Sequence, residues 1–296
     1  MSTRSNDKVM IKCIKNTYWL WTPPILIAMK ESSASLWCPE TAFYMDRILN
    51  IRWKEVKMNA NTSVNQASGK SDLTRKVRNR MVQVVVQFLI LAAILFISSG
   101  RLDWVWAWAY LGMSVGILVI NLLVVSPELM AERGEIKENV KGWDKVLATI
   151  ISLLTLSAFV VIGLDERFGW SPQLDLAIHL VALIFWALGQ GLFSWAMASN
   201  KFFSGTVRIQ MDRDHTVVTS GPYQYVRHPG YVGYITSFFL ATPLALGSLW
   251  ALIPGGLGAL LLVTRTALED RTLLEELDGY KEYAQHVRYR LLPGIW

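Results

Sequence analysis

Long apolar runs, separated by short polar segments, dominate the chain beyond residue 80. Four runs are nearly free of charge, at 81–98, 104–125, 146–164 and 176–199. Each is close to the roughly 20 residues that a helix needs to cross the hydrocarbon core of a bilayer. This pattern predicts an all-α integral membrane protein with at least four transmembrane helices.

A fifth apolar region, 231–263, is too long for a single span. It contains Gly247-Ser248 and Pro254-Gly255-Gly256, and both clusters interrupt a helical pattern. We therefore expect a C-terminal helical hairpin with two short arms. The total is five to six transmembrane helices, depending on whether both arms cross fully.

Composition strengthens the membrane interpretation and changes the meaning of the charge. Hydrophobic residues make up 52% of the 296 positions, charged residues only 18%, and 13 residues are Trp, which gathers where a bilayer meets water. The net charge of +6 could indicate nucleic acid, but no basic groove with interleaved aromatic residues is evident. The cations lie instead before the first run, in alternate loops and in the tail. The positive-inside rule then predicts that the N- and C-termini are cytoplasmic. Because no basic groove is evident, we expect no nucleic-acid partner.

Four regions follow from these patterns. Residues 1–57 form an uncertain N-terminal extension, which we interpret as an upstream addition that contributes little to the fold, without a signal peptide. Residues 58–80 form a polar and basic cytoplasmic segment whose beginning, 59–72, is typical of a flexible terminus. The four transmembrane helices occupy 81–199. Residues 200–296 hold a candidate cofactor-binding region with the hairpin and the tail.

Metal and thiol chemistry find little support in the sequence. The two cysteines, Cys13 and Cys38, precede the apolar region and fit no zinc or redox spacing. The four histidines form neither an HxxxH nor an HExxH pattern. We expect no metal site.

The segment 215–234, HTVVTSGPYQYVRHPGYVGY, is polar and punctuated by Gly and Pro between apolar runs. Irregular polar backbone beside a bilayer is tolerated where protein or water satisfies it, so the segment is a candidate small-molecule site. Pro229 can open a helix at its first position. Arg227, His228 and Tyr231 supply a cation, a titratable ring and a phenol. The simpler interpretation is an aromatic and basic anchor at the membrane interface.

The tail 264–288 is charged and periodic. Arg271 and Glu275 are four residues apart and share one helix face. A short hairpin would return them beside His228 and Tyr231, giving a pocket with one end in water and one in lipid. Alone, the tail is equally typical of a solvated amphipathic helix.

Together these two segments, HTVVTSGPYQYVRHPGYVGY and EDRTLLEELDGYKEYAQHVRYRLLP, resemble the isoprenylcysteine carboxyl methyltransferase family. More distantly they are similar to membrane phospholipid N-methyltransferases. The resemblance covers the C-terminal third of the chain. It implies S-adenosylmethionine as methyl donor and a prenylated or lipid-like substrate that enters from the bilayer.

Residue by residue, the resemblance implies a catalytic group of Arg271, His228 and Tyr231, with Arg271 at the substrate carboxylate. It also implies cofactor contacts from one set of residues. These are Gln210, His215, Thr216, Val217, Val218, Tyr223, His228, Pro229, Gly230, Tyr231 and Glu275.

The implied chemistry suits these residue types. A carboxylate is already ionised at pH 7, so its methylation by in-line displacement needs alignment and exclusion of water rather than a strong base. Arg271 could hold the carboxylate by two parallel hydrogen bonds, and Glu275 could pair with the ammonium of the cofactor.

Three alternatives remain open. Methylation of a phospholipid or other amine requires a base, for which Glu276 and His228 are candidates. An NADPH-dependent sterol-type membrane reductase has a similar architecture and tail. A non-catalytic transporter would favour polar groups at mid-membrane, and the clear spans are nearly free of charge there.

Overall fold

The computed structural model describes residues 39–135 and 139–296. The predictions for residues 1–38, including those for Cys13 and Cys38, lie outside the described residues. Every regular element in the described ranges is a helix, as the apolar runs predicted. Contacts divide the chain into two units, of which the second, Ser68–Trp296, holds the elements described below.

The first helix in the described residues is α3 (Pro39–Ser99), and its part from Ser68 onward belongs to the second unit. The polar stretch 59–72, expected to be a flexible terminus, is part of this helix. An established helix extends at little further cost, since each added residue fixes its own backbone for one new hydrogen bond.

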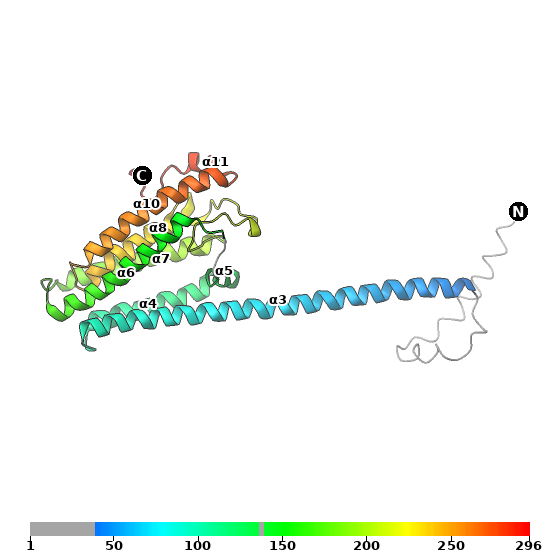
Figure 1. Ribbon diagram of the computed structural model, residues 1–296, viewed down its shortest axis with the longest axis horizontal. Helices are drawn as coiled ribbons and strands as arrows, with labels where there is room; N and C mark the ends of the chain where they lie inside the picture. Colours follow the sequence, from blue (N-terminus) through cyan, green and yellow to red (C-terminus); the bar gives the residue numbers. More distant parts are fainter. Residues whose placement is uncertain (1–38, 136–138) are drawn as a thin grey trace. The chain divides into compact units, whose positions relative to one another are not determined.

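Five helices in the described residues are long and apolar enough to cross a membrane. Besides the segment Gly69–Ser99 of α3, they are α4 (Val105–Val124), α6 (Gly142–Phe168), α7 (Leu176–Ser199) and α10 (Leu252–Glu276). The four charge-free runs therefore correspond to four of these helices, and the bounds of α7 agree with the predicted ones. Figure 1 shows α6, α7, α8 and α10 running side by side, with α4 beside the C-terminal part of α3.

The predicted fifth region is built from short helices followed by α10. The chain passes through α8 (Pro229–Tyr234), the π-helix η3 (Ile235–Ala241) and α9 (Thr242–Ala245) before a turn leads into α10. α8 begins at Pro229, as predicted. Pro254-Gly255-Gly256 was wrongly expected to break the chain, and it lies within α10 instead. Pro254 is the third residue of α10, where a backbone N–H would have no partner in the helix anyway.

The short helices run antiparallel to α7 in close contact with it. Near one end, a Cβ placed on Gly233 would lie only 2.5 Å from the carbonyl oxygen of Gly189, so the two backbones touch. Near the other end, Nδ1 of His179 lies 2.9 Å from the carbonyl oxygen of Ala245. Together with a Cβ on Gly230, which would lie 3.9 Å from the Cβ of Ala196, the two contacts show that α8, η3 and α9 follow most of the length of α7.

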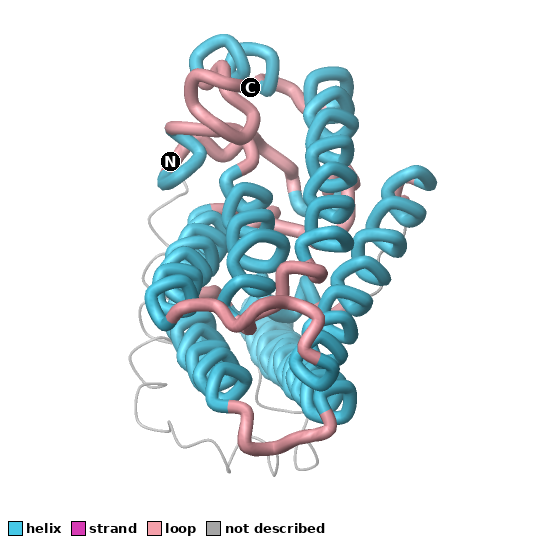
Figure 2. The backbone as a smooth tube through the Cα atoms, turned by 90° about the vertical axis from the view of Figure 1, so that its left-hand side faces the viewer, coloured by secondary structure: helices cyan, strands magenta, loops and turns pink. Residues whose placement is uncertain are grey.

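A buried aromatic cluster joins the long helices. Trp186 of α7 packs against Tyr110 of α4, with ring centroids 5.1 Å apart, and Tyr110 also meets Phe159 of α6 at 6.1 Å. All three side chains are almost fully buried. This cluster fixes the middle of the bundle and leaves its two ends, visible as loops in Figure 2, to carry the polar groups.

At the end of the bundle that holds the α6–α7 connection and the α9–α10 turn, a buried carboxylate ties the two loops together. Asp165 is 3% exposed and accepts hydrogen bonds from the backbone N–H of Ser171 at 2.7 Å and from its hydroxyl at 2.6 Å. The hydroxyl of Ser248 donates to the same carboxylate at 2.5 Å. The Ser171 hydroxyl in turn accepts from the N–H of Leu249. We call this group of residues the Asp165 network.

Candidate functional site

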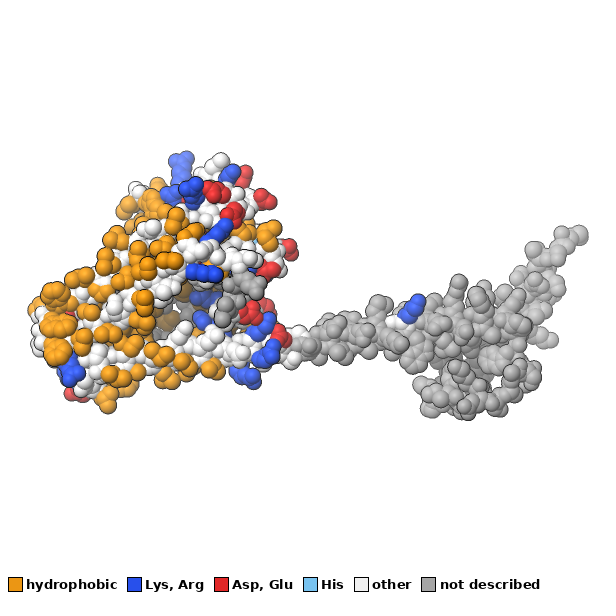
Figure 3. Space-filling model, in the orientation of Figure 1, with side chains coloured by type: hydrophobic (Ala, Val, Ile, Leu, Met, Phe, Trp, Pro, Cys, Tyr) orange, Lys and Arg blue, Asp and Glu red, His pale blue; other side chains and the backbone are white. Residues whose placement is uncertain are grey.

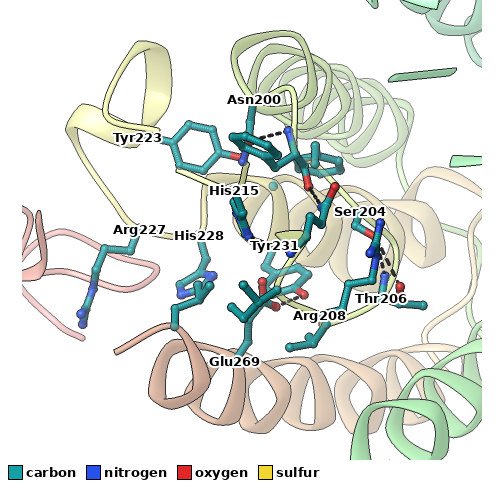
Figure 4. A pocket seen from close by; sticks show the side chains of 17 residues that line it. Asn200, Ser204, Thr206, Arg208, His215, Tyr223, Arg227, His228, Tyr231 and Glu269 are labelled. Atoms are coloured by element: carbon teal, nitrogen blue, oxygen red, sulfur yellow. Dashed lines mark hydrogen bonds between the residues drawn. The ribbon is translucent and has the colours of Figure 1, made fainter. Parts of the chain in front are cut away.

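A pocket lies at the opposite end of the bundle, between the α7–α8 loop, the start of α8 and the last turns of α10 (Figure 4). Its lining combines aromatic, cationic and acidic side chains. The residues are Asn200, Phe202, Phe203, Ser204, Thr206, Val207, Arg208, Ile209, Gln210, His215, Tyr223, Arg227, His228, Gly230, Tyr231, Glu269 and Leu273. Most come from the α7–α8 loop, part of which the sequence singled out, and the rest come from α8 and α10.

Because Gly230 has no side chain, the aromatic ring of Phe203 can pack directly against it at the edge of this pocket. A Cβ at this position would lie 2.7 Å from the ring of Phe203, closer than real side chains approach, so Phe203 occupies the space that a side chain would take. Phe202, Tyr223 and Tyr231 add further rings to the lining. Such surfaces are suited to the flat face of a purine, because stacked aromatic groups attract one another.

His215 is neutral in this environment. Its Nδ1 accepts a hydrogen bond from the backbone N–H of Gln210 at 3.3 Å, and its ring lies 4.5 Å from that of Phe202. Burial, reinforced by the positive charges of Arg208 and Arg213, lowers the pKa of His215 from 6.5 to about 4. The ring therefore contributes a polar, uncharged surface at physiological pH.

An acid and a fixed arginine lie where α8 meets α10. The hydroxyl of Tyr231 donates a short hydrogen bond to Glu269. Arg265 lies beneath the Tyr231 ring, with its guanidinium carbon 5.4 Å from the centroid, and donates to Asp144 of α6 at 2.6 Å. It also donates to the carbonyl of Gly205 at 2.8 Å. Arg265 is thus fixed by protein partners through its Nε and Nη2 atoms and packs against Tyr231, whereas Glu269 lines the pocket.

Asp270, which follows Glu269 in α10, contacts four side chains. Two of them, Arg227 and His228, belong to the segment before α8, so Asp270 anchors that segment. It is fully buried and lies 3.3 Å from Nε2 of His228 and 3.2 Å from a guanidinium nitrogen of Arg227. Tyr280 donates to it at 2.9 Å and Arg290 at 2.8 Å. We call this group the Asp270 network. A buried carboxylate with several charged donors is strongly held as an anion.

The C-terminal tail completes this anchor through its backbone. The N–H of Arg227 donates to the carbonyl of Tyr289, and that of His228 donates to the carbonyl of Arg290, both at 2.9 Å. The pocket segment before α8 is therefore fixed by the tail on one side and by α10 on the other.

Two arginines of the pocket have donors to spare. The Nε atoms of Arg208 and Arg227 are buried and make no hydrogen bond. The other guanidinium nitrogens of Arg208 donate to Glu132 and Asp212, each at 2.8 Å. Because a buried donor without an acceptor is costly, such atoms indicate that an anionic or polar ligand group can be accommodated here.

Comparisons with known proteins bear on the same region. Residues 181–275, from α7 through the pocket loop to the last turn of α10, match the model of the isoprenylcysteine carboxyl methyltransferase (ICMT) family. Over this part of the chain, the sequence is similar to the isoprenylcysteine carboxyl methyltransferase family. A protein-S-isoprenylcysteine O-methyltransferase of Schizosaccharomyces pombe is 46% identical over 68 residues, which are 23% of this chain and 28% of that protein. The aligned part is thus about a quarter of each chain.

Six of the residues expected from the resemblance to this methyltransferase family line the pocket together. They are Gln210, His215, Tyr223, His228, Gly230 and Tyr231. Gln210 is almost fully buried, and its side chain donates to the carbonyl of Phe202 and accepts from Arg213, so its hydrogen bonds hold the loop.

The other expected cofactor residues of the loop do not line the pocket. Val217 packs with Leu277, Tyr280 and Tyr283 at the base of the C-terminal helix α11 (Tyr280–His286), and Thr216 and Val218 flank it without lining the pocket. Pro229 is buried as the first residue of α8. Their contacts with the cofactor stay predictions.

The expectation that Arg271 and Glu275 lie beside His228 and Tyr231 is wrong. They pair with each other at 2.8 Å on the outer face of α10, with side chains 77% and 56% exposed, and neither lines the pocket. At about 100° per residue, Arg271 points about 200° away from Glu269. The α10 residues that contact Tyr231 and His228 are instead Glu269 and Asp270. The catalytic roles of Arg271 and Glu275 stay predictions.

A signal for Glu269 is present in the sequence, although the family resemblance pointed to Arg271 and Glu275 instead. Leu262, Arg265, Glu269 and Leu273 recur at three- and four-residue spacing and continue one stripe of the apolar helix into its polar end. Leu262 and Arg265, nearer the start of α10, are buried, so a charged residue that continues the same stripe, such as Glu269, is a candidate site residue. Arg271 does not lie on this stripe.

Proposed function

We propose that this protein is an S-adenosylmethionine-dependent membrane methyltransferase that O-methylates the carboxylate of a prenylcysteine or a similar lipid-like acceptor. The observation that carries the proposal is the pocket inside the family-matched region, where aromatic rings, the Glu269 carboxylate and an arginine with an unsatisfied donor, Arg208, line one space.

The chemistry of this donor set fits the proposed cofactor. Phe202, Phe203 and Tyr223 offer surfaces for the adenine ring, and Glu269 can pair with the ammonium group. The buried Nε of Arg208, which has no hydrogen-bond partner, can donate to the cofactor's carboxylate. When bound, the cofactor supplies an electrophilic methyl group on a positively charged sulfur.

The chain's own residues then have to orient the acceptor and exclude water. A carboxylate acceptor is ionised at neutral pH, so no base is required. This distinguishes it from an amine, which must lose a proton before it attacks. His228 Nε2 faces Asp270, and this contact fixes the orientation of the ring at the pocket.

The surface suits an acceptor that arrives from the bilayer. Figure 3 shows hydrophobic side chains covering the middle of the bundle, and Lys, Arg, Asp and Glu gathered at the end near α5 (Pro127–Arg133) and α11. The same view shows a hollow between the α3–α4 pair and the helices above it. We propose that a prenyl chain enters here, gaining roughly 0.8 kcal/mol per buried methylene.

The same charge distribution supports an orientation. Cationic residues concentrate at the pocket end, so we propose that this end and both chain termini face the cytoplasm. In this topology both arms of the C-terminal hairpin, α8–η3–α9 and α10, cross the membrane.

The test is methyl transfer in lipid vesicles from tritiated S-adenosylmethionine, with a farnesylcysteine analogue and phosphatidylethanolamine as competing acceptors. We expect label on the farnesylcysteine carboxylate as a base-labile ester. Glu269→Gln should reduce this transfer at least tenfold, whereas the exposed Glu282→Gln should not. Label on the amine lipid alone would contradict the acceptor, and binding of NADPH without binding of S-adenosylhomocysteine would contradict the methyltransferase proposal.

A further inference from the structure

The first turn of α6 carries a buried carboxylate that lies outside the family-matched residues 181–275. Asp144 is the third residue of α6, and its side chain is fully buried. An acid is favourable at the start of a helix, but a fully buried one has to be matched by donors from the protein. The partners of Asp144 therefore show what this carboxylate holds together.

The two oxygens of Asp144 accept from two other segments of the pocket end. Oδ1 accepts from Nε of Arg265 at 2.6 Å, and Oδ2 accepts from Nη2 of the same guanidinium at 3.3 Å. Oδ2 also accepts from the backbone N–H of Val207 at 2.8 Å. A two-point contact fixes the plane of a guanidinium as well as its position. Asp144 thus joins α6 to α10 and to the α7–α8 loop.

A second hydrogen bond holds the loop to α6 at the same residue. The backbone N–H of Lys141, which precedes α6, donates to the carbonyl of Val207 at 3.3 Å. Both backbone polar groups of Val207 are therefore engaged by the start of α6. Val207 and its neighbours Thr206 and Arg208 line the pocket. These two hydrogen bonds consequently constrain where this part of the pocket wall lies.

Arg265 extends the constraint to another wall of the pocket. It donates to the carbonyl of Gly205 at 2.8 Å, and its guanidinium carbon lies 5.4 Å from the ring centroid of Tyr231. Tyr231 in turn donates to Glu269, and both of these side chains line the pocket. A carboxylate on α6 therefore constrains, through one arginine, the pocket groups that α8 and α10 contribute.

The charge of Asp144 matters more for this arrangement than its shape. The Arg265 side chain is also buried, at 8% exposure, so without the carboxylate its guanidinium would lack a counter-charge away from water. A buried cation in that state is strongly unfavourable and tends to move toward other acceptors or toward solvent. The contacts that would change with it are those to Gly205 and Tyr231.

We propose that Asp144 is a positioning residue of the methyl-transfer site, which acts through Arg265 and Val207 to hold the pocket walls in the geometry that binds the cofactor. This inference rests on the proposed function and deepens it by assigning part of the site's framework to α6. Asp144 does not itself line the pocket, so its effect on the reaction is indirect. Asp165 is the matched control, because it is also a buried carboxylate of α6 but belongs to the opposite end of the bundle.

The first experiment needs no ligand. Hydrogen–deuterium exchange should show the backbone amides of 204–210 exchanging about tenfold faster in Asp144→Asn than in the wild type, because the loop opens more readily once its anchor is weakened. Asp144→Glu keeps the charge and shifts it by one methylene, so it should show a smaller change of the same kind. Asp165→Asn should leave the exchange of this segment unchanged. Unchanged exchange of 204–210 in both Asp144 variants would overturn the proposal.

The second experiment measures the consequence for the reaction. Asp144→Asn should bind S-adenosylhomocysteine about tenfold more weakly and transfer methyl groups with a kcat/KM lowered roughly 10–100-fold, because small displacements of positioned groups have effects of this size. Asp144→Glu should recover part of both, and Asp165→Asn should change neither. Wild-type binding and turnover in a folded Asp144→Asn variant would overturn the proposal. Faster loop exchange in Asp144→Asn, together with no binding of S-adenosylhomocysteine by the wild type, would instead overturn the proposed function alone.

Discussion

The two ends of the helix bundle each contain a buried carboxylate, but the carboxylates have different kinds of partner. Asp165 accepts only from neutral donors, the hydroxyls of Ser171 and Ser248 and one backbone N–H. Asp270 is surrounded by Arg227, His228, Arg290 and Tyr280. Asp165 joins the α6–α7 connection to the α9–α10 turn. Asp270 binds several cationic side chains and so fixes the segment that precedes α8.

The ends also differ in what they leave unsatisfied. Among the described residues, the buried guanidinium nitrogens that lack a hydrogen bond belong to Arg133, Arg208 and Arg227, all at the pocket end. In the Asp165 network, by contrast, the Ser171 and Ser248 hydroxyls both donate and accept. This contrast teaches that buried charge alone does not identify a site. Unused donors next to a cavity are the more informative feature.

Replacing Asp270 by Asn should have the largest effect. It leaves Arg227 and Arg290 buried or half-buried without a counter-charge, for which the cost is about 3–5 kcal/mol. We expect a large fall in the unfolding temperature in detergent and loss of S-adenosylhomocysteine binding. Asp278→Asn, at an exposed position two residues beyond α10, is the control. A folded Asp270→Asn variant that binds the cofactor product normally would show that the Asp270 network does not support the pocket.

Replacing Asp165 by Asn should destabilise the protein less and leave the pocket intact. The amide keeps one acceptor oxygen for the Ser171 and Ser248 hydroxyls but places an N–H where an acceptor was, at a cost of about 1–3 kcal/mol. We expect a lower unfolding temperature with unchanged KM values for cofactor and acceptor. A specific rise in either KM would show that the two ends are coupled, contrary to what their separate networks imply.

The smallest effect concerns pH. The pKa of His215 is about 4 in the folded protein against 6.5 unfolded, so the unfolded state binds a proton more readily between these values. The stabilisation from neutral His215 is thus full above pH 6.5 and is lost as pH falls toward 4. Chemical unfolding at about pH 7 and about pH 5 should show a larger loss of stability in the wild type than in His215→Gln. Equal losses would mean that His215 titrates normally.

Much of the fold follows from the sequence because the length and polarity of each apolar run leave few choices. A run of about 20 apolar residues has few alternatives to a membrane helix. All four such runs correspond to helices, three of them with bounds close to those predicted. The broken region was harder. Gly247-Ser248 lies in the turn, whereas Pro254 is accommodated in the first turn of α10, and only the neighbouring packing decides between these outcomes.

The site was only partly predictable for a similar reason. The loop residues His215, Tyr223 and His228 were evident from local composition, and they line the pocket. Glu269 and Asp270 were not distinguished from Arg271 and Glu275, because all four lie on one charged helix and the side that faces the pocket depends on how α10 packs against α8.

The central claim is that the pocket containing Glu269 holds the methyl donor, with Arg271 outside it. Calorimetric titration of S-adenosylhomocysteine into wild-type, Glu269→Gln and Arg271→Gln protein tests this most directly. We predict binding by the wild type and by Arg271→Gln with similar affinity, and at least tenfold weaker binding by Glu269→Gln. Wild-type affinity in Glu269→Gln together with a loss of binding in Arg271→Gln would contradict the claim.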